Sequence, residues 1–190
     1  MKFMPLFCVY QGGDSFVAKD QIPFDRAYYA KLLLRFALCY YWHMEYPSRV
    51  VLASDHAGFP LKEAVKEYLA SKGIDIVDVG TFSEESVDYP SIVREGCAVV
   101  LEQECPGIVF GGSGNGEAMA ANKVRGIRAA LCYSEESTRL AREHNNANVM
   151  SMGGRLIEAD LAIKLVDIFL TTTFEGGRHE PRINDLDPHE

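Results

Sequence analysis

The chain has 190 residues, 47% of them hydrophobic, and a formal net charge of −8. This composition predicts one folded domain with a short appendage and excludes an intrinsically disordered chain. A nucleic-acid-binding protein usually carries a basic face, so the acidic balance argues against nucleic acid as a partner. The five cysteines are odd in number and form no CxxC pair, which predicts neither a disulfide framework nor a zinc site. Reduced thiols of this kind are typical of a cytoplasmic protein.

Residues 1–47 differ from the remainder in their aromatic clusters and nearly balanced charge, and we treat them as an N-terminal extension. An organism-specific addition, a gene-model artefact and an oligomer contact all remain open for it. Its apolar run, 27–42, is interrupted by Lys31 and Arg35 and is shorter than the ~20 residues of a membrane-spanning helix. The run also begins too far along the chain for an ordinary signal peptide, so we expect no membrane association.

From Arg49 onward, short apolar runs alternate with stretches of helical periodicity. In chain order the pattern predicts a strand at 50–53, a helix at 60–73, a strand at 74–79, a helix at 90–102, a strand at 107–110, a helix at 117–123, a strand at 127–131, a helix at 134–144, a strand at 149–152 and a helix at 159–170. This alternation predicts an α/β domain over 48–173, with a five-stranded parallel sheet covered on both faces. The polar tail, 174–190, is expected to pack on the surface or on a partner subunit.

Ligands of such sheets bind beyond the carboxyl ends of the strands. This rule places Asp55, His56, the glycine loop at 111–116 and the segment after Met152 along one rim. Glycines let backbone N–H groups approach a ligand closely, and the helix that follows favours an anion. The loop reads GGSGNG, which is neither the dinucleotide pattern GxGxxG nor a P-loop. The structural alternative is a tight strand-to-helix turn.

Glu117 comes directly after this loop. An acid in the first turn of a helix interacts favourably with the helix dipole, which is the structural alternative for this residue. The functional interpretation is a general base: an isomerase that forms an enediolate needs a base beside the substrate carbon and donors beside its carbonyl oxygen. Glu117 and the loop amides would supply both from one short segment.

Two further polar groups are candidates. Asp55-His56 follows the first strand and His144-Asn145 ends the fourth helix, where backbone capping and a helix-dipole contact are the structural alternatives. A histidine titrates near neutrality and therefore suits acid–base work at sugar oxygens. Arginines suit phosphate oxygens, and the chain has Arg155 after a glycine pair and a basic cluster in the tail. That cluster consists of Arg178, His179 and Arg182, and a solvated surface patch is its structural alternative.

Seven motifs occur together in one order. They are VLASDHAG (51–58), DYP (88–90), GGSGNG (111–116), AANK (120–123), GIRA (126–129), REHNNAN (142–148) and GGR (153–155). In this order they resemble ribose-5-phosphate isomerase B, within a group that also includes allose-6-phosphate and galactose-6-phosphate isomerases. The resemblance extends over about 49–183. It implies a Rossmann-like three-layer αβα sandwich, a homodimer or tetramer with shared active sites, and no metal ion or organic cofactor.

The resemblance also implies a role for each candidate. Asp55 and His144 would open the sugar ring, with His144 as proton donor, and Glu117 would move the proton between C1 and C2 through a cis-enediolate. Ser113 would act with the loop amides on the developing oxyanion. The implied substrate-binding residues are Asp55, His56, Tyr89, Gly112, Ser113, Gly114, Asn115, Gly116, Asn145, Arg155, Arg178 and Arg182. Among these, His56 and the three arginines would hold the phosphate.

One departure from the family pattern is informative. Many members have a cysteine base at the position that matches Gly111, whereas this chain resembles the branch with a glutamate after the glycine loop. That branch favours ribose 5-phosphate, so we expect a five-carbon substrate. A six-carbon sugar-phosphate isomerase and a non-catalytic phosphosugar-binding module remain the alternatives. The second departure is the extension at 1–47, which has no counterpart in the family.

Overall fold

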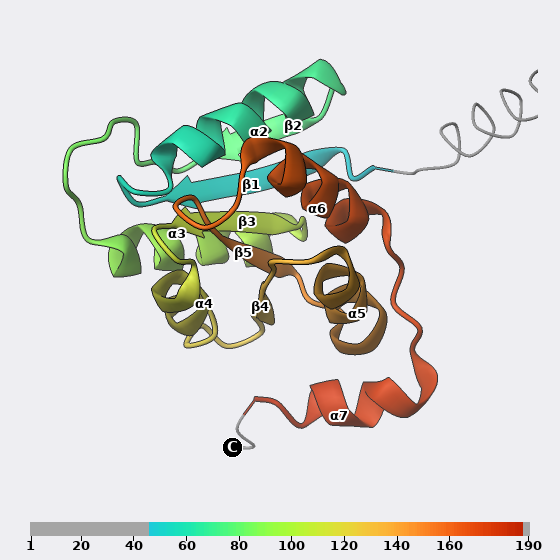
Figure 1. Ribbon diagram of the computed structural model, residues 1–190. Coiled ribbons are helices and arrows are strands. Elements are labelled where there is room, and N and C mark those ends of the chain that lie inside the picture. The colour runs from blue at the N-terminus through green and yellow to red at the C-terminus, as the bar shows by residue number, and fades with distance from the viewer. Residues whose placement is uncertain (1–45, 188–190) are drawn as a thin grey trace, which may run out of the picture. The chain divides into compact units, whose positions relative to one another are not determined.

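Figure 1 shows the computed structural model, which describes residues 46–187. Most of the predicted extension therefore lies outside the described residues. The elements are β1 (Arg49–Ser54), α2 (Phe59–Ser71), β2 (Asp75–Asp78), α3 (Tyr89–Gln103), β3 (Gly107–Gly111), α4 (Asn115–Ala121), β4 (Ala129–Leu131), α5 (Glu135–Asn145), β5 (Val149–Gly153), α6 (Ala159–Thr171), the 3₁₀ turn η1 (Gly177–His179) and α7 (Glu180–Asn184). Within this part of the chain, no helix has the length and apolar character needed to span a bilayer.

The sheet has five strands in the order β2-β1-β3-β5-β4, and each neighbouring pair is parallel. The predicted five-stranded parallel sheet is thus confirmed. Strand β2 lies on one side of β1 and strand β3 on the other, so the direction in which strands are added reverses at β1. A crevice forms beyond the carboxyl ends of the strands at such a reversal. Asp55 follows β1 and Gly112 follows β3, so both border this crevice.

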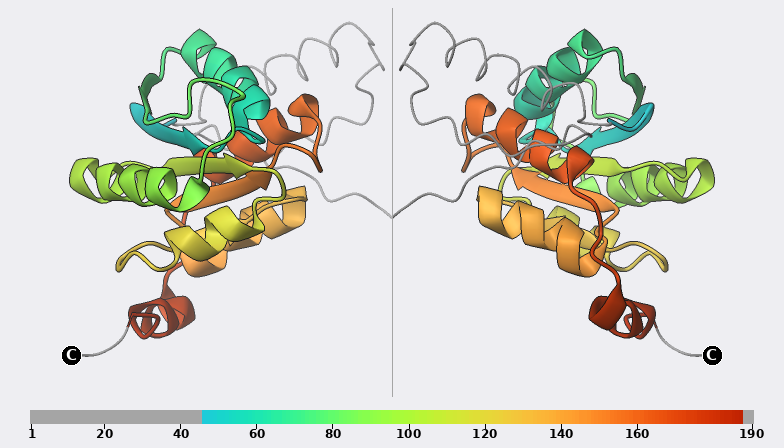
Figure 2. Two further views of the ribbon diagram at one scale, coloured as in Figure 1. Left: turned by 90° about the vertical axis from the view of Figure 1, so that its left-hand side faces the viewer. Right: turned by 90° about the vertical axis from the view of Figure 1, so that its right-hand side faces the viewer.

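Helices cover both faces of the sheet, as the two side views in Figure 2 show. Successive residues of a strand point to opposite faces. Val50 and Leu52 of β1 accordingly pack in one core with α2, α5 and α6, while Val51 and Ala53 pack in a second core with α3 and α4. The central strands are therefore mostly apolar, because they are buried on both sides. This is the predicted three-layer αβα sandwich.

The predicted bounds of the strands and helices all lie within two residues of the observed ones, and α4 and the tail are where the differences bear on the site. Helix α4 begins at Asn115, two residues before the predicted start, because Gly114 makes the turn with φ of +77° and Gly116 already lies in the helix. Glycine is a poor helix former, which is why the sequence pattern assigned Gly116 to the loop. The tail, for which the sequence predicted no helix or strand, contains η1 and α7. Pro181 near the start of α7 suits the first helical turn.

Candidate active site

A cavity of about 430 Å³ opens at the carboxyl ends of β1 and β3. Its lining consists of Asp55, Tyr89, Gly112, Ser113, Gly116, Glu117, Arg155 and Leu156. Seven of these eight residues are candidates from the sequence, and Leu156 is the addition. The volume of the cavity lies within the usual range for small-molecule sites, ~300–1,000 Å³. A larger hollow of about 770 Å³ lies elsewhere, against Tyr46, Pro106 and Phe169, and includes none of these polar groups.

The carboxylate of Glu117 occupies the space that a side chain at position 111 would need. A Cβ placed on Gly111 would lie 2.0 Å from Cδ and 2.0 Å from Oε1 of Glu117. Glu117 is only 4% exposed, although it stands in the first turn of α4. Burial, together with the charge of Asp55, raises the pKa of the Glu117 carboxyl above its ordinary value. A buried carboxylate with a raised pKa inside a polar cavity has the properties of a general base.

Asp55 is held by the backbone that follows it. Its Oδ1 accepts hydrogen bonds from the N–H groups of Ala57 at 2.9 Å and Gly58 at 2.8 Å. Gly58 crosses β3 so closely that a Cβ there would lie 2.4 Å from the carbonyl carbon of Phe110. This crossing brings the β1 loop against the end of β3. The turn that holds Oδ1 thus fixes Asp55 in the lining of the cavity.

The glycine loop is tied to the end of β5. The N–H of Gly154 donates to the carbonyl of Gly111 at 2.8 Å, and the N–H of Arg155 donates to that of Gly112 at 3.1 Å. The buried hydroxyl of Ser151 donates to the carbonyl of Gly114 at 2.7 Å. These bonds make the loop a preorganised wall, which is what stabilisation of a developing oxyanion requires.

Ser113 and Asn115 interact with each other inside the loop. The backbone N–H and the side-chain amide of Asn115 both donate to the Ser113 hydroxyl oxygen at 3.3 Å. With its lone pairs engaged, that hydroxyl is left to donate its own proton. Tyr133 was not among the sequence candidates, yet its hydroxyl donates to the carbonyl of Ser113. Burial and the charge of Glu117 raise the pKa of this phenol, which keeps it a donor.

The signal for Tyr133 was available in the sequence. It follows β4 by two residues, so the rule that placed Asp55 and the glycine loop at the carboxyl rim places Tyr133 there too. Ser151 carried no such signal, because it reads as an ordinary polar residue inside an apolar strand.

Two further candidates, Tyr89 and Arg155, line the cavity, and His56 follows Asp55 in the chain. His56 Nδ1 accepts the N–H of Val87 at 3.3 Å, which leaves Nε2 as the ring nitrogen that can donate a hydrogen bond. The Tyr89 ring lies over Gly116, where a Cβ would come within 2.6 Å of its hydroxyl oxygen. The Arg155 guanidinium reaches Gly112, with Nη1 3.7 Å from the position of a Cβ there.

The remaining candidates lie at the opposite rim of the sheet. Helix α5 runs back from β4 toward the start of β5, so His144 and Asn145 stand at the amino ends of the strands. Arg178 and Arg182 belong to η1 and α7, in the tail that follows α6 down that same side (Figure 1). One chain therefore does not bring His144, Asn145, Arg178 and Arg182 together with Glu117.

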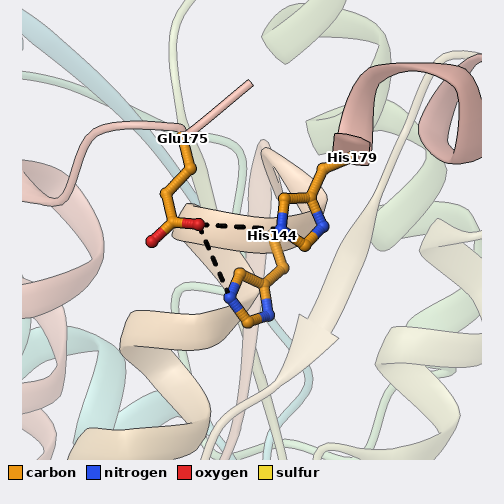
Figure 3. Close-up of side chains that lie close together, drawn as sticks. All are labelled: His144, Glu175 and His179. Atoms are coloured by element: carbon orange, nitrogen blue, oxygen red, sulfur yellow. Dashed lines mark ion pairs between the residues drawn. The ribbon is translucent and has the colours of Figure 1, made fainter. Parts of the chain in front are cut away.

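His144 has two close neighbours in the tail, Glu175 and His179 (Figure 3). Their nitrogen and oxygen donor atoms lie within 4.8 Å of one another, which is a donor set of the kind that holds a metal ion. The two imidazole rings, however, stack with centroids 4.3 Å apart and planes 10° apart. Nitrogen lone pairs lie in the ring planes, so parallel rings do not converge on one ion. The arrangement does not fit a metal centre.

Comparison with known proteins agrees with this geometry. A family model described as Ribose/Galactose Isomerase matches residues 50–186. A ribose-5-phosphate isomerase B from Mycolicibacterium paratuberculosis is 45% identical over 145 residues, 75% of this chain and 91% of that protein. The crystal structure of a ribose 5-phosphate isomerase from Thermotoga maritima is 54% identical with a TM-score of 0.72, covering 73% of this chain and 97% of that one.

A third relative was solved with a ligand. The ribose-5-phosphate isomerase B of Mycoplasma genitalium with bound ribulose-5-phosphate is 40% identical with a TM-score of 0.69, and the match covers 73% of this chain and 93% of that one. The family match at 50–186 includes the glycine loop, Glu117 and the tail histidine His179. The chain is a member of the ribose/galactose isomerase family.

Proposed function

We propose that the protein interconverts D-ribose 5-phosphate and D-ribulose 5-phosphate as an aldose–ketose isomerase. The observation that carries this proposal is the Glu117 carboxylate, buried beside the glycine loop in the space left by Gly111. A binding module does not need a carboxylate with a raised pKa at that place, because an anionic ligand would be repelled by it. A base that removes a proton next to a carbonyl group does need it.

The reaction begins with the closed furanose. His144 gives a proton to the ring oxygen O4 while Asp55 accepts the proton of the C1 hydroxyl, so the C1–O4 bond breaks and an aldehyde forms at C1. Glu117 then takes the proton from C2, and the electron pair moves into a cis-enediolate. The loop amides and the Ser113 hydroxyl stabilise the negative charge on O1. Glu117 returns its proton to C1, the O2 proton moves to O1, and a ketone remains at C2.

The site is completed by a second copy of the chain. His144 and the tail arginines lie at the opposite rim from Glu117 within one subunit, so one chain cannot place its own acid and base on one sugar. A symmetric dimer forms two equivalent active sites, and each combines the base of one subunit with the acid of the other. In that arrangement Arg178 and Arg182 of one copy add to His56 and Arg155 of the other as the phosphate clamp.

Mixed dimers test this sharing. Chains with Glu117→Gln and chains with His144→Asn are each expected to be nearly inactive. Refolded together in equal amounts, they should recover about a quarter of wild-type activity, because half of the dimers are mixed and each of these has one intact site. Activity no higher than the sum of the separate variants would contradict a shared site. Light scattering on the wild type separates a dimer from a tetramer, and both accommodate the proposal.

The substrate assignment has a direct test. We expect conversion of ribose 5-phosphate to ribulose 5-phosphate with a kcat/KM well above that for allose 6-phosphate or galactose 6-phosphate, compared side by side. A preference for either hexose phosphate would replace the substrate and keep the chemistry. Binding of all three sugars without turnover would favour a non-catalytic module. The free thiols Cys97, Cys105 and Cys132 fit a reducing compartment, so we place the protein in the cytoplasm.

A further inference from the structure

His144 stands against two residues to which the proposed mechanism gives no role. The Nε2 atom of His144 lies 3.8 Å from Oε2 of Glu175, and the same oxygen lies 3.6 Å from Nε2 of His179 (Figure 3). The two rings are stacked, with the His144 side chain 34% exposed and that of His179 8% exposed. A half-exposed ring therefore rests on a buried one, and a carboxylate lies across both.

The hydrogen bonding separates the roles of the two histidines. The Nε–H of Arg178 donates to Nε2 of His179 at 3.2 Å, so this nitrogen carries a lone pair and His179 is neutral. Burial and then the nearby charge of His144 lower the pKa of His179, which agrees with that state. A neutral His179 offers a flat surface without a competing charge. His144 is then the ring that is packed on one face by neutral His179 and has the Glu175 carboxylate beside its Nε2 atom.

The backbone fixes this arrangement. The N–H of Glu175 donates to the carbonyl of Glu143 at 3.0 Å, and Arg142 Nε donates to the carbonyl of Thr172 at 3.3 Å. The tail is thus bound to the last turn of α5, beside His144. Gly176 and Gly177 then turn the chain with φ values of +67° and +57°, a conformation that glycine adopts without strain. This turn brings His179 back over the His144 ring.

We propose that Glu175 and His179 are positioning residues for furanose ring opening: the Glu175 carboxylate faces the Nε2 edge of the His144 ring, and the stacked His179 ring fixes the plane from which His144 delivers its proton. The inference rests on the proposed function, in which His144 is the ring-opening acid. It adds that the tail sets the orientation of that acid.

The chemistry of the two sugars separates ring opening from proton transfer. Ribose 5-phosphate closes a furanose through O4 and must be opened. Ribulose 5-phosphate would need O5 to close a five-membered ring, and O5 carries the phosphate, so the ketose is open-chain. Exchange of a C1 proton of ribulose 5-phosphate with deuterium from solvent therefore requires Glu117 and no ring opening. NMR follows this exchange, and a coupled assay follows turnover of ribose 5-phosphate.

Glu175→Gln keeps the shape of the side chain and removes its charge. We expect turnover of ribose 5-phosphate to fall about tenfold, within the range of general acid–base effects, and C1 exchange to stay within about twofold of wild type. His179→Phe keeps a ring for stacking and should lose less turnover than His179→Ala. Glu180→Gln removes an exposed carboxylate from the same tail and is the matched control, expected to leave both rates unchanged.

The outcomes separate the two proposals. A wild-type protein with neither turnover nor exchange would overturn the proposed function itself. An active wild type whose Glu175→Gln variant loses turnover and exchange equally would make Glu175 a general structural residue and overturn the inference. Unchanged turnover in Glu175→Gln would overturn it as well. Only loss of turnover with exchange retained supports a role in ring opening.

Discussion

Glu117→Gln is expected to lower kcat for ribose 5-phosphate by at least about a thousandfold, within the range seen when a general base is removed. The amide has nearly the shape of the carboxylate, so the 2.0 Å approach to the Gly111 position and the fit of the sugar phosphate are kept. Substrate binding, measured by calorimetry, should therefore change little. A variant with normal turnover would exclude Glu117 as the base.

The stability of the same variant is the control for folding, and its sign follows from the raised pKa of Glu117. A carboxyl with a higher pKa in the folded state favours folding while it is protonated, below its unfolded pKa of about 4.3. This contribution is lost as the pH rises through the folded pKa, because the buried group must then ionise. We expect Glu117→Gln to melt at or above the wild-type temperature at pH 7, and the difference to shrink at pH 4. Lower stability of the variant at pH 7 would contradict the raised pKa.

Much of the fold follows from local patterns. Alternation of apolar runs with helical periodicity predicts the five parallel strands, and the rule for carboxyl ends places Asp55 and the glycine loop at one rim. Local patterns do not show what fills a gap between elements. Lys62 is completely buried on α2, where it forms ion pairs with Asp78 of β2 at 2.6 Å and with Glu63 at 3.0 Å. Nothing in the periodicity of α2 distinguishes it from an exposed lysine, since its partner lies 16 residues away.

The sequence predicts most residues of the candidate site, but it does not predict which of them lie together in one chain. The motif order identifies Asp55, Glu117 and His144 together, but strand order and helix direction put His144 at the other rim. Contacts between side chains were equally hidden. Glu175 reads as one acid in a polar tail until the turn at Gly176 sets it beside His144. The room at Gly111 is visible in the sequence only as a missing side chain, whereas the structure shows the carboxylate that fills it.

Gly111→Ala is expected to reduce kcat about a hundredfold, as a base displaced by about 1 Å commonly does. The added methyl group would lie 2.0 Å from Cδ of Glu117, and one of the two must move. Gly111 is the last residue of β3, pairs with Gly153 and accepts the N–H of Gly154 at 2.8 Å, so its backbone is held. The carboxylate therefore moves. Gly112→Ala is the neighbouring comparison, because a Cβ there meets nothing nearer than 3.5 Å and should cost less kcat.

A double-mutant cycle separates this clash from a general loss of stability. We expect Gly111→Ala to destabilise the wild type by about 1–3 kcal/mol, the usual cost of overpacking. In a Glu117→Ala background the carboxylate is gone, so the same methyl group should cost almost nothing, and the coupling measured by urea unfolding should equal most of the single-variant effect. Additive costs would place the strain elsewhere in the loop. Strong coupling would mean that Gly111 and Glu117 act together, because the missing side chain at position 111 leaves the space that the Glu117 carboxylate occupies.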